Sequence, residues 1–144
     1  MAGCSGGSGR LSLDSPALAG SRAHACAALV EALPRHVDDQ ARRRVDAGGG
    51  YAAAWGDPAI ELRCGVGRPT GLTATSTCQR ADGVDWFVPE DEVTGRPTDV
   101  TMTTVGRSVY VEVRLPEAYF PPAAAMVDLA PALKRTTRSV RPCL

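Results

Sequence analysis

Aromatic residues are scarce in this sequence, which contains two Trp, three Tyr and two Phe among 144 residues. The core therefore has to be filled mainly by Ala, Val and Leu. An excess of charge of one sign is also lacking, because sixteen Lys and Arg balance sixteen Asp and Glu. This balance argues against a nucleic-acid binder that works by bulk electrostatics. The length corresponds to one ordinary domain, and 44% hydrophobic residues are enough to form a core.

Signatures of catalysis and metal binding are missing as well. The predicted domain, residues 21–144, has no Gly-x-Ser-x-Gly elbow, and the histidines, His24 and His36, lie on an early helix and in the segment that follows it. None of its five cysteines belongs to a C-x-x-C pair of the redox or zinc type. We therefore expect no catalytic residue, no metal and no cofactor.

The cysteine content indicates an oxidising compartment. Cys4 follows Ala2-Gly3, which has the form of the end of a lipobox, and precedes a flexible Ser/Gly run. No apolar stretch precedes it, so we expect a signal truncated by a late start assignment. The sequence predicts an extracytoplasmic domain anchored to the cell membrane by lipid on Cys4. The other four cysteines are suited to two disulfides.

Composition divides the chain into a tether and a domain. Residues 1–20 are rich in Gly and Ser and predict a disordered tether, whereas 21–144 predict a single domain. Apolar residues spaced by three and four predict a helix from Ser21 to Leu33. Residues 35–50 show little periodicity and predict an exposed connection. Its basic triplet, 42–44, is either a solvated loop or, beside a membrane, a contact for anionic headgroups.

Alternating apolar residues predict four strands, near 59–66, 84–88, 100–105 and 108–115. We expect them to share one sheet. The last two should form a hairpin with a type II′ turn at Gly106-Arg107, because glycine accepts positive φ. The two tryptophans, Trp55 and Trp86, are predicted to pack in the core.

A closing helical segment follows Pro121-Pro122 and is interrupted by Pro131. Because a proline deep in a helix costs about 3 kcal/mol, we expect the helix to start again with Asp128 as its N-cap. The predicted fold is therefore α+β: a mainly antiparallel, four-stranded sheet with the N-terminal and C-terminal helices packed on it.

The sequence resembles the actinobacterial DUF3515 family in three blocks, 54–66, 82–86 and 103–113. Residues 26–34, in the first predicted helix and at its end, also resemble that family. The resemblance covers about residues 22–137. It implies a small exported protein, often lipid-anchored, of unknown function, and it transfers no catalytic residue. The sequence departs from the family pattern at Pro131 and in its truncated signal.

The pairing of the four remaining cysteines has three solutions. A helix packed on a sheet can bring Cys26 and Cys64 within bridging distance, which favours Cys26–Cys64 and leaves Cys78 for Cys143. The DUF3515 resemblance agrees, since Cys26 and Cys64 fall inside its motifs. A competing solution joins Cys64 to Cys78 and Cys26 to Cys143.

Two functions remain open at this point. The first is a non-enzymatic, lipoprotein-like interaction or accessory domain of the cell envelope, whose partners are the membrane and an unknown envelope protein or ligand. The second is a small-ligand-binding or hydrolytic envelope enzyme, with Arg63, Asp85 and Arg107 as candidate ligand-binding residues. A concave pocket that joins two or more of these residues would favour the second.

Overall fold

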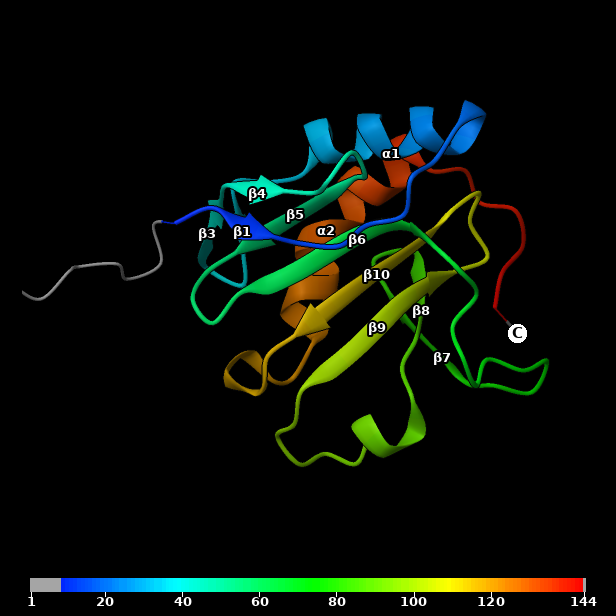
Figure 1. Ribbon diagram of the computed structural model, residues 1–144. Helices are drawn as coiled ribbons and strands as arrows, with labels where there is room; N and C mark the ends of the chain where they lie inside the picture. Colours follow the sequence, from blue (N-terminus) through cyan, green and yellow to red (C-terminus); the bar gives the residue numbers. More distant parts are fainter. Residues whose placement is uncertain (1–8, 144) are drawn as a thin grey trace, which may run out of the picture.

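The structure, a computed structural model, describes residues 9–143 of an α+β domain with two α-helices (Figure 1). Cys4 and the lipobox-like residues before it lie outside the described residues. The helices are α1 (Gly20–Ala32) and α2 (Ala123–Thr136), and η1 (Glu90–Glu92) and η2 (Glu117–Tyr119) are short 3₁₀ turns. The strands are β1 (Leu11–Ser12), β2 (His36–Val37), β3 (Gln40–Arg43), β4 (Val45–Asp46), β5 (Ala52–Trp55), β6 (Ile60–Val66), β7 (Cys78–Ala81), β8 (Val84–Phe87), β9 (Val100–Val105) and β10 (Tyr110–Leu115).

The main sheet has eight strands rather than the four expected from the sequence. Its order is β2-β3-β5-β6-β10-β9-β8-β7, and every neighbouring pair is antiparallel. The four predicted strands correspond to β6, β8, β9 and β10. The segment 35–50, predicted to be an exposed connection, instead contains β2, β3 and β4, and the unpredicted strand β5 follows it. Their alternation is weak because they are short, polar or buried on both faces.

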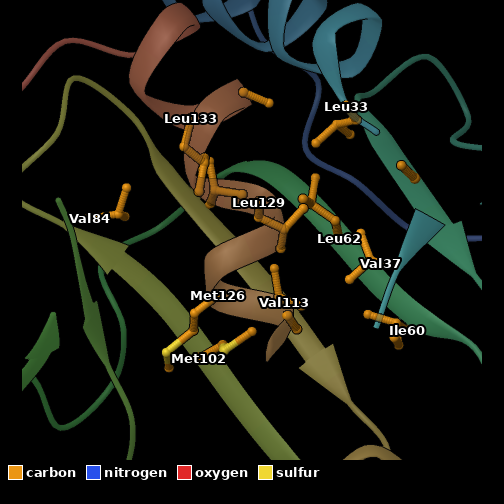
Figure 2. Close-up of a cluster of buried hydrophobic side chains, with 14 of the residues drawn as sticks. Leu33, Val37, Ile60, Leu62, Val84, Met102, Val113, Met126, Leu129 and Leu133 are labelled. Carbon is orange, nitrogen blue, oxygen red and sulfur yellow. The ribbon is translucent and has the colours of Figure 1, made fainter. Parts of the chain in front are cut away.

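Both helices cover one face of the sheet, and the core lies between them and the strands. Figure 2 shows Met126, Leu129 and Leu133 of α2 directed toward the strands. Leu62 and Met102 meet them from the sheet and are fully buried. Trp55 and Trp86 are also fully buried, as predicted. A few large side chains thus complete a core in which Ala, Val and Leu occupy most positions.

The opposite face of the sheet is covered at one end by the chain that leads into α1. β1 pairs in parallel with β4, and Leu13 is buried against Ala52 and Ala54 of β5. This explains why all four residues of β5 are buried. The structure differs here from the expectation of a tether over residues 1–20, because residues from Leu11 onward belong to the folded domain.

Helix α2 continues through Pro131, so the predicted new start at Asp128 is wrong. Buried side chains lie on both sides of the proline, including Met126, Leu129 and Leu133. Burying each large apolar side chain contributes about 1.5–3 kcal/mol, which together exceeds the cost of one interior proline. The Asp128 carboxylate accepts the backbone N–H of Asp38 at 2.8 Å.

Replacing Pro131 with alanine should stabilise the domain by about 2 kcal/mol. Pro131 is exposed and deprives the carbonyl of Val127 of its helical donor, and alanine restores this bond. The free energy of unfolding in urea measures the gain. Arg135→Ala, at an exposed position in the same helix, should stay within about 0.5 kcal/mol of wild type. A Pro131→Ala variant no more stable than wild type would contradict this account.

The β9–β10 hairpin forms as expected, but its turn is longer than a two-residue type II′ turn. Residues 106–109 connect the strands, and Gly106 has φ +74°. The longer loop is stabilised by the C-terminal tail, because the Gly106 carbonyl accepts the N–H groups of Val140 at 2.7 Å and Arg141 at 3.1 Å.

Two disulfides join the elements. Cys26 of α1 bonds to Cys64 of β6 inside the core, with their Cα atoms 5.6 Å apart. Cys78 of the edge strand β7 bonds to Cys143 of the tail, with a Cα separation of 6.1 Å. This is the pairing favoured by helix-on-sheet geometry. Neither α1 nor α2 is long and apolar enough to cross a membrane.

Candidate functional site

An irregularity in β6 shapes the end of the sheet where the candidate site lies. Val66 pairs with Tyr110 and Cys64 with Val111, so Gly65 is an extra residue opposite β10. Its φ of +85° suits glycine, and a Cβ there would lie 2.2 Å from Leu18 Cδ1. The bulge therefore depends on glycine at this position and directs the loop after β6 away from the sheet.

The hairpin tip and the C-terminal tail form the other wall. Beyond the two bonds at Gly106, Ser108 N–H donates to the Arg138 carbonyl at 2.8 Å, and Arg138 N–H donates to Ser108 Oγ at 3.0 Å. The Cys78–Cys143 disulfide holds the far end of the tail. Figure 1 shows this tail, the hairpin tip and the start of α1 at the same end of the sheet.

Between these walls lies a cleft of about 740 Å³ that is lined by four arginines, which we call the arginine cleft. The arginines come from α1, the loop after β6, the hairpin tip and the tail. None of the residues that line it is Asp or Glu. The arginines are Arg22, Arg68, Arg107 and Arg141. Four hydroxyl-bearing side chains also line it: Thr73, Ser76, Ser108 and Tyr110.

Three of the four arginines are oriented by hydrogen bonds to the protein. Arg22 donates to the Gly65 carbonyl at 3.1 Å and Arg68 to the Leu72 carbonyl at 2.9 Å. Arg107 donates through Nε to Thr137 Oγ1 at 2.6 Å and through an Nη to the Thr137 carbonyl at 2.8 Å. Arg141 is exposed, and its side chain has no hydrogen bond within residues 9–143. Each guanidinium keeps unused donors, since it has five N–H groups.

Arg107 is the most deeply placed of these cations. Burial lowers its pKa, an effect that the nearby carboxylate of Asp85 partly opposes. Asp85 itself is occupied elsewhere, because it accepts Arg80 Nε at 2.8 Å and the N–H of Cys143 at 3.0 Å. The Asp85 carboxylate therefore bonds to the edge strand β7 and to the C-terminal tail, and it lies outside the lining of the arginine cleft.

The three residues proposed from the sequence do not come together in one cavity. Arg107 lines the arginine cleft, Asp85 lines a separate hollow beside Cys78, and Arg63 lies on the outer face of the sheet. Arg63 donates to the Asp14 carbonyl at 2.8 Å and forms an ion pair with Glu61 at 2.9 Å.

Sequence analysis missed three arginines of the cleft, Arg22, Arg68 and Arg141. They are far apart along the chain, and no local motif links them. Only the β6 bulge and the bonds between tail and hairpin tip bring them together.

The basic triplet Arg42-Arg43-Arg44 has mainly structural contacts. Arg42 lies over the Trp55 ring at 6.0 Å and donates to the carbonyls of Val30 and Leu33. Arg43 donates to the carbonyls of Gly56 and Gly9. Neither guanidinium is therefore a free contact for lipid headgroups, and the triplet belongs mostly to β3 rather than to a solvated loop.

Acidic side chains gather at the opposite end of the sheet, around the β2–β3 and β5–β6 turns. Asp38 lies close to Asp39 and Asp128, and burial followed by these two charges raises its pKa. Burial and then Asp57 and Asp38 raise the pKa of Tyr119. A chain of zero net charge thus separates an acidic cluster from an arginine cleft.

Asp38→Asn should stabilise the domain by about 0.5 kcal/mol at neutral pH, in the range of exposed charge pairs. Asparagine removes the repulsion between the carboxylate of Asp38 and those of Asp39 and Asp128. It also tolerates the φ of +50° at this position. Because the folded pKa of Asp38 is raised, its ionised form opposes folding. The benefit should therefore shrink as pH falls through that raised pKa and vanish below the unfolded value of about 3.9.

Thermal melts of Asp38→Asn and wild type over a pH series test this dependence. Asp14→Asn is the matched control, since Asp14 lies beside Arg63 and its neutralisation should not stabilise the fold. A gain for Asp38→Asn that persists unchanged in acid would refute the electrostatic explanation.

Comparisons with known proteins agree with the resemblance noted from the sequence blocks. No curated protein and no solved structure matches the chain. A family model described as a protein of unknown function, DUF3515, matches residues 9–141. That range begins at the chain that covers β5 and ends in the tail that lines the cleft. The chain therefore belongs to the DUF3515 family.

Proposed function

We propose that this domain is a non-catalytic binding module of the cell envelope that presents the arginine cleft to a ligand. The observation that carries the proposal is the composition of the cleft. It is rich in arginine, which stays protonated in proteins, and its lining includes no histidine or carboxylate that could move a proton. Hydroxyls such as Ser108 and Tyr110 have no base beside them to activate them as nucleophiles. Such a cleft can hold an anion but has no group to transform it.

Two disulfides support an extracytoplasmic location for this module, because such bonds persist in oxidising compartments. We further propose that lipid on Cys4 attaches the domain to the membrane. Gly9 lies near Gly56, because the Arg43 guanidinium donates hydrogen bonds to the carbonyls of both residues. The described chain therefore begins at the acidic end of the sheet, away from the arginine cleft at the other end.

Photo-cross-linking in cells tests the binding function. A photoreactive amino acid replaces Tyr110 at the cleft or, as a matched control, Val127, which is 50% exposed on α2. The protein is expressed behind a lipoprotein signal, and its mass is measured after illumination. We expect an adduct at position 110 and none at position 127. An unmodified protein at 110, or equal adducts at both positions, would contradict a binding role for the cleft.

The location has a separate test with the same expression system. The wild-type protein should partition into detergent, whereas Cys4→Ser should remain in the aqueous phase, because only the thiol of Cys4 can carry the anchor. Unchanged partition of Cys4→Ser would show that lipid on this residue does not tether the domain.

A further inference from the structure

No carboxylate in the lining of the arginine cleft balances its charge, and Asp85 acts on Arg107 from outside that lining. Four guanidinium groups share one cavity without a carboxylate in its lining, although the whole chain is neutral. Arg22 adds to this imbalance, because it lies in the first turn of α1, where the helix dipole disfavours a cation. No acidic residue occupies that turn, and Ala19 provides no side-chain cap. The cleft thus gathers positive charge that a bound anion would neutralise.

The donors of the cleft match an anion with several oxygens. Arg107 uses Nε and one Nη to bind Thr137, which fixes the plane of its guanidinium and leaves other N–H groups to face the cavity. Ser108 Oγ already accepts the Arg138 N–H, so its hydroxyl hydrogen remains available to donate. Fixed guanidinium planes combined with hydroxyl donors are well suited to phosphate oxygens.

We propose, building on the binding function above, that the arginine cleft recognises a phosphate-bearing ligand, with a diphosphate the best match to its charge. A monocarboxylate carries one negative charge and would neutralise only one of the four cations that line the cleft. A phosphate monoester or diphosphate carries two or three charges and more acceptor oxygens. The volume of about 740 Å³ leaves room for an organic portion of the ligand beside the phosphate.

The phosphate has two sources, a soluble ligand or a lipid headgroup, and the course of the chain favours the soluble one. The contacts of the N-terminal segment show its course. Leu11 N–H donates to the Arg44 carbonyl, and the Asp14 carbonyl accepts a hydrogen bond from Arg63. Leu18 then lies beside Gly65. The segment therefore runs along the sheet from the acidic end to the cleft. Figure 1 shows the described chain entering at the end of the sheet opposite the C-terminal tail that lines the cleft, and an anchor upstream of residue 9 therefore favours a soluble ligand.

Binding is measured by calorimetry on the full chain carrying Cys4→Ser, with both disulfides intact. Sodium pyrophosphate is the soluble probe, and malonate is a dicarboxylate of comparable size. Vesicles of phosphatidylglycerol, compared with phosphatidylcholine vesicles, provide the lipid probe. We expect pyrophosphate to bind, malonate to bind about tenfold more weakly or not at all, and vesicles to bind weakly.

The test variant is Arg68→Gln/Arg141→Gln, which removes two exposed cations of the cleft. Its affinity for pyrophosphate should fall about tenfold or more, while its melting temperature without ligand should stay close to that of wild type, because both side chains are exposed. Arg96→Gln/Arg135→Gln is the matched control, with the same change of net charge outside the cleft, and should bind as wild type.

Binding of phosphatidylglycerol vesicles that the cleft variant abolishes would also support phosphate recognition, and would assign the phosphate to a lipid. The proposal is overturned if neither probe binds, if malonate binds as tightly as pyrophosphate, or if both double variants weaken binding equally. Cross-linking at position 110 together with any of these results would reject the phosphate ligand and retain the binding function.

Discussion

Replacing Cys26 and Cys64 together with alanine should lower the free energy of unfolding by about 4–5 kcal/mol. The disulfide closes a sequence separation of 38 residues, so its loss releases conformational freedom in the unfolded chain worth about 4 kcal/mol on the loop-entropy model. Both cysteines are fully buried, and two alanines also leave an unfilled volume between α1 and β6. For a domain near the lower end of the ordinary range of about 5–15 kcal/mol, this loss is most of the free energy of unfolding.

Urea denaturation without reducing agent, in a Cys4→Ser background, measures this loss. The matched control is Cys78→Ala/Cys143→Ala, which opens a sequence separation of 65 residues but frees a partly exposed tail. Because that tail also gains freedom in the folded state, the control should lose less stability than the core variant. Equal losses for the two pairs would contradict a special contribution of the buried bond.

Trp55→Ala should destabilise the domain by about 3–5 kcal/mol, as expected for a large buried aromatic residue. Trp55 is fully buried, donates from Nε1 to the Pro34 carbonyl at 3.0 Å and supports the guanidinium of Arg42. One side chain thus connects β5, β3 and the end of α1. Its removal opens a cavity and deprives the Pro34 carbonyl of its donor.

A comparison of two Trp→Phe variants separates the hydrogen bond from the packing. Trp86 is equally buried, but its Nε1 has no partner among residues 9–143. Phenylalanine at position 86 removes an unsatisfied polar group, whereas at position 55 it breaks a bond. We therefore expect Trp86→Phe to cost about 1 kcal/mol less than Trp55→Phe. Chemical denaturation resolves this difference, and the reverse order would show that cavity volume alone determines the cost.

Two of the predicted strands, β6 and β10, have one covered face and one half-exposed face. In β6, Ile60, Leu62 and Cys64 alternate with the half-buried Glu61 and Arg63, and this period of two is visible without a structure. In β5 the alternation disappears, because helices cover one face and the N-terminal segment covers the other. Small alanines at these positions reflect close packing, but by composition alone they do not indicate a strand.

Local rules also failed where distant parts of the chain decide the outcome. The proline rule predicted a break in α2, yet burial of Leu129 and Leu133 keeps the helix continuous. The presence of glycine at position 106 correctly predicted a positive φ there. It did not predict the length of the loop, which is determined by hydrogen bonds from the C-terminal tail. The arginine cleft is assembled in the same way, from side chains that only the folded topology brings together.

The outermost strands of the sheet, β2 and β7, have two and four residues. A long exposed edge would offer free backbone groups to a neighbouring molecule and invite strand addition or aggregation. Here one edge is too short for stable strand pairing, and at the other Cys78 is bonded to the C-terminal tail. Extension of the sheet by an added strand is therefore disfavoured at both edges, which leaves side chains and loops as the surfaces open to contact.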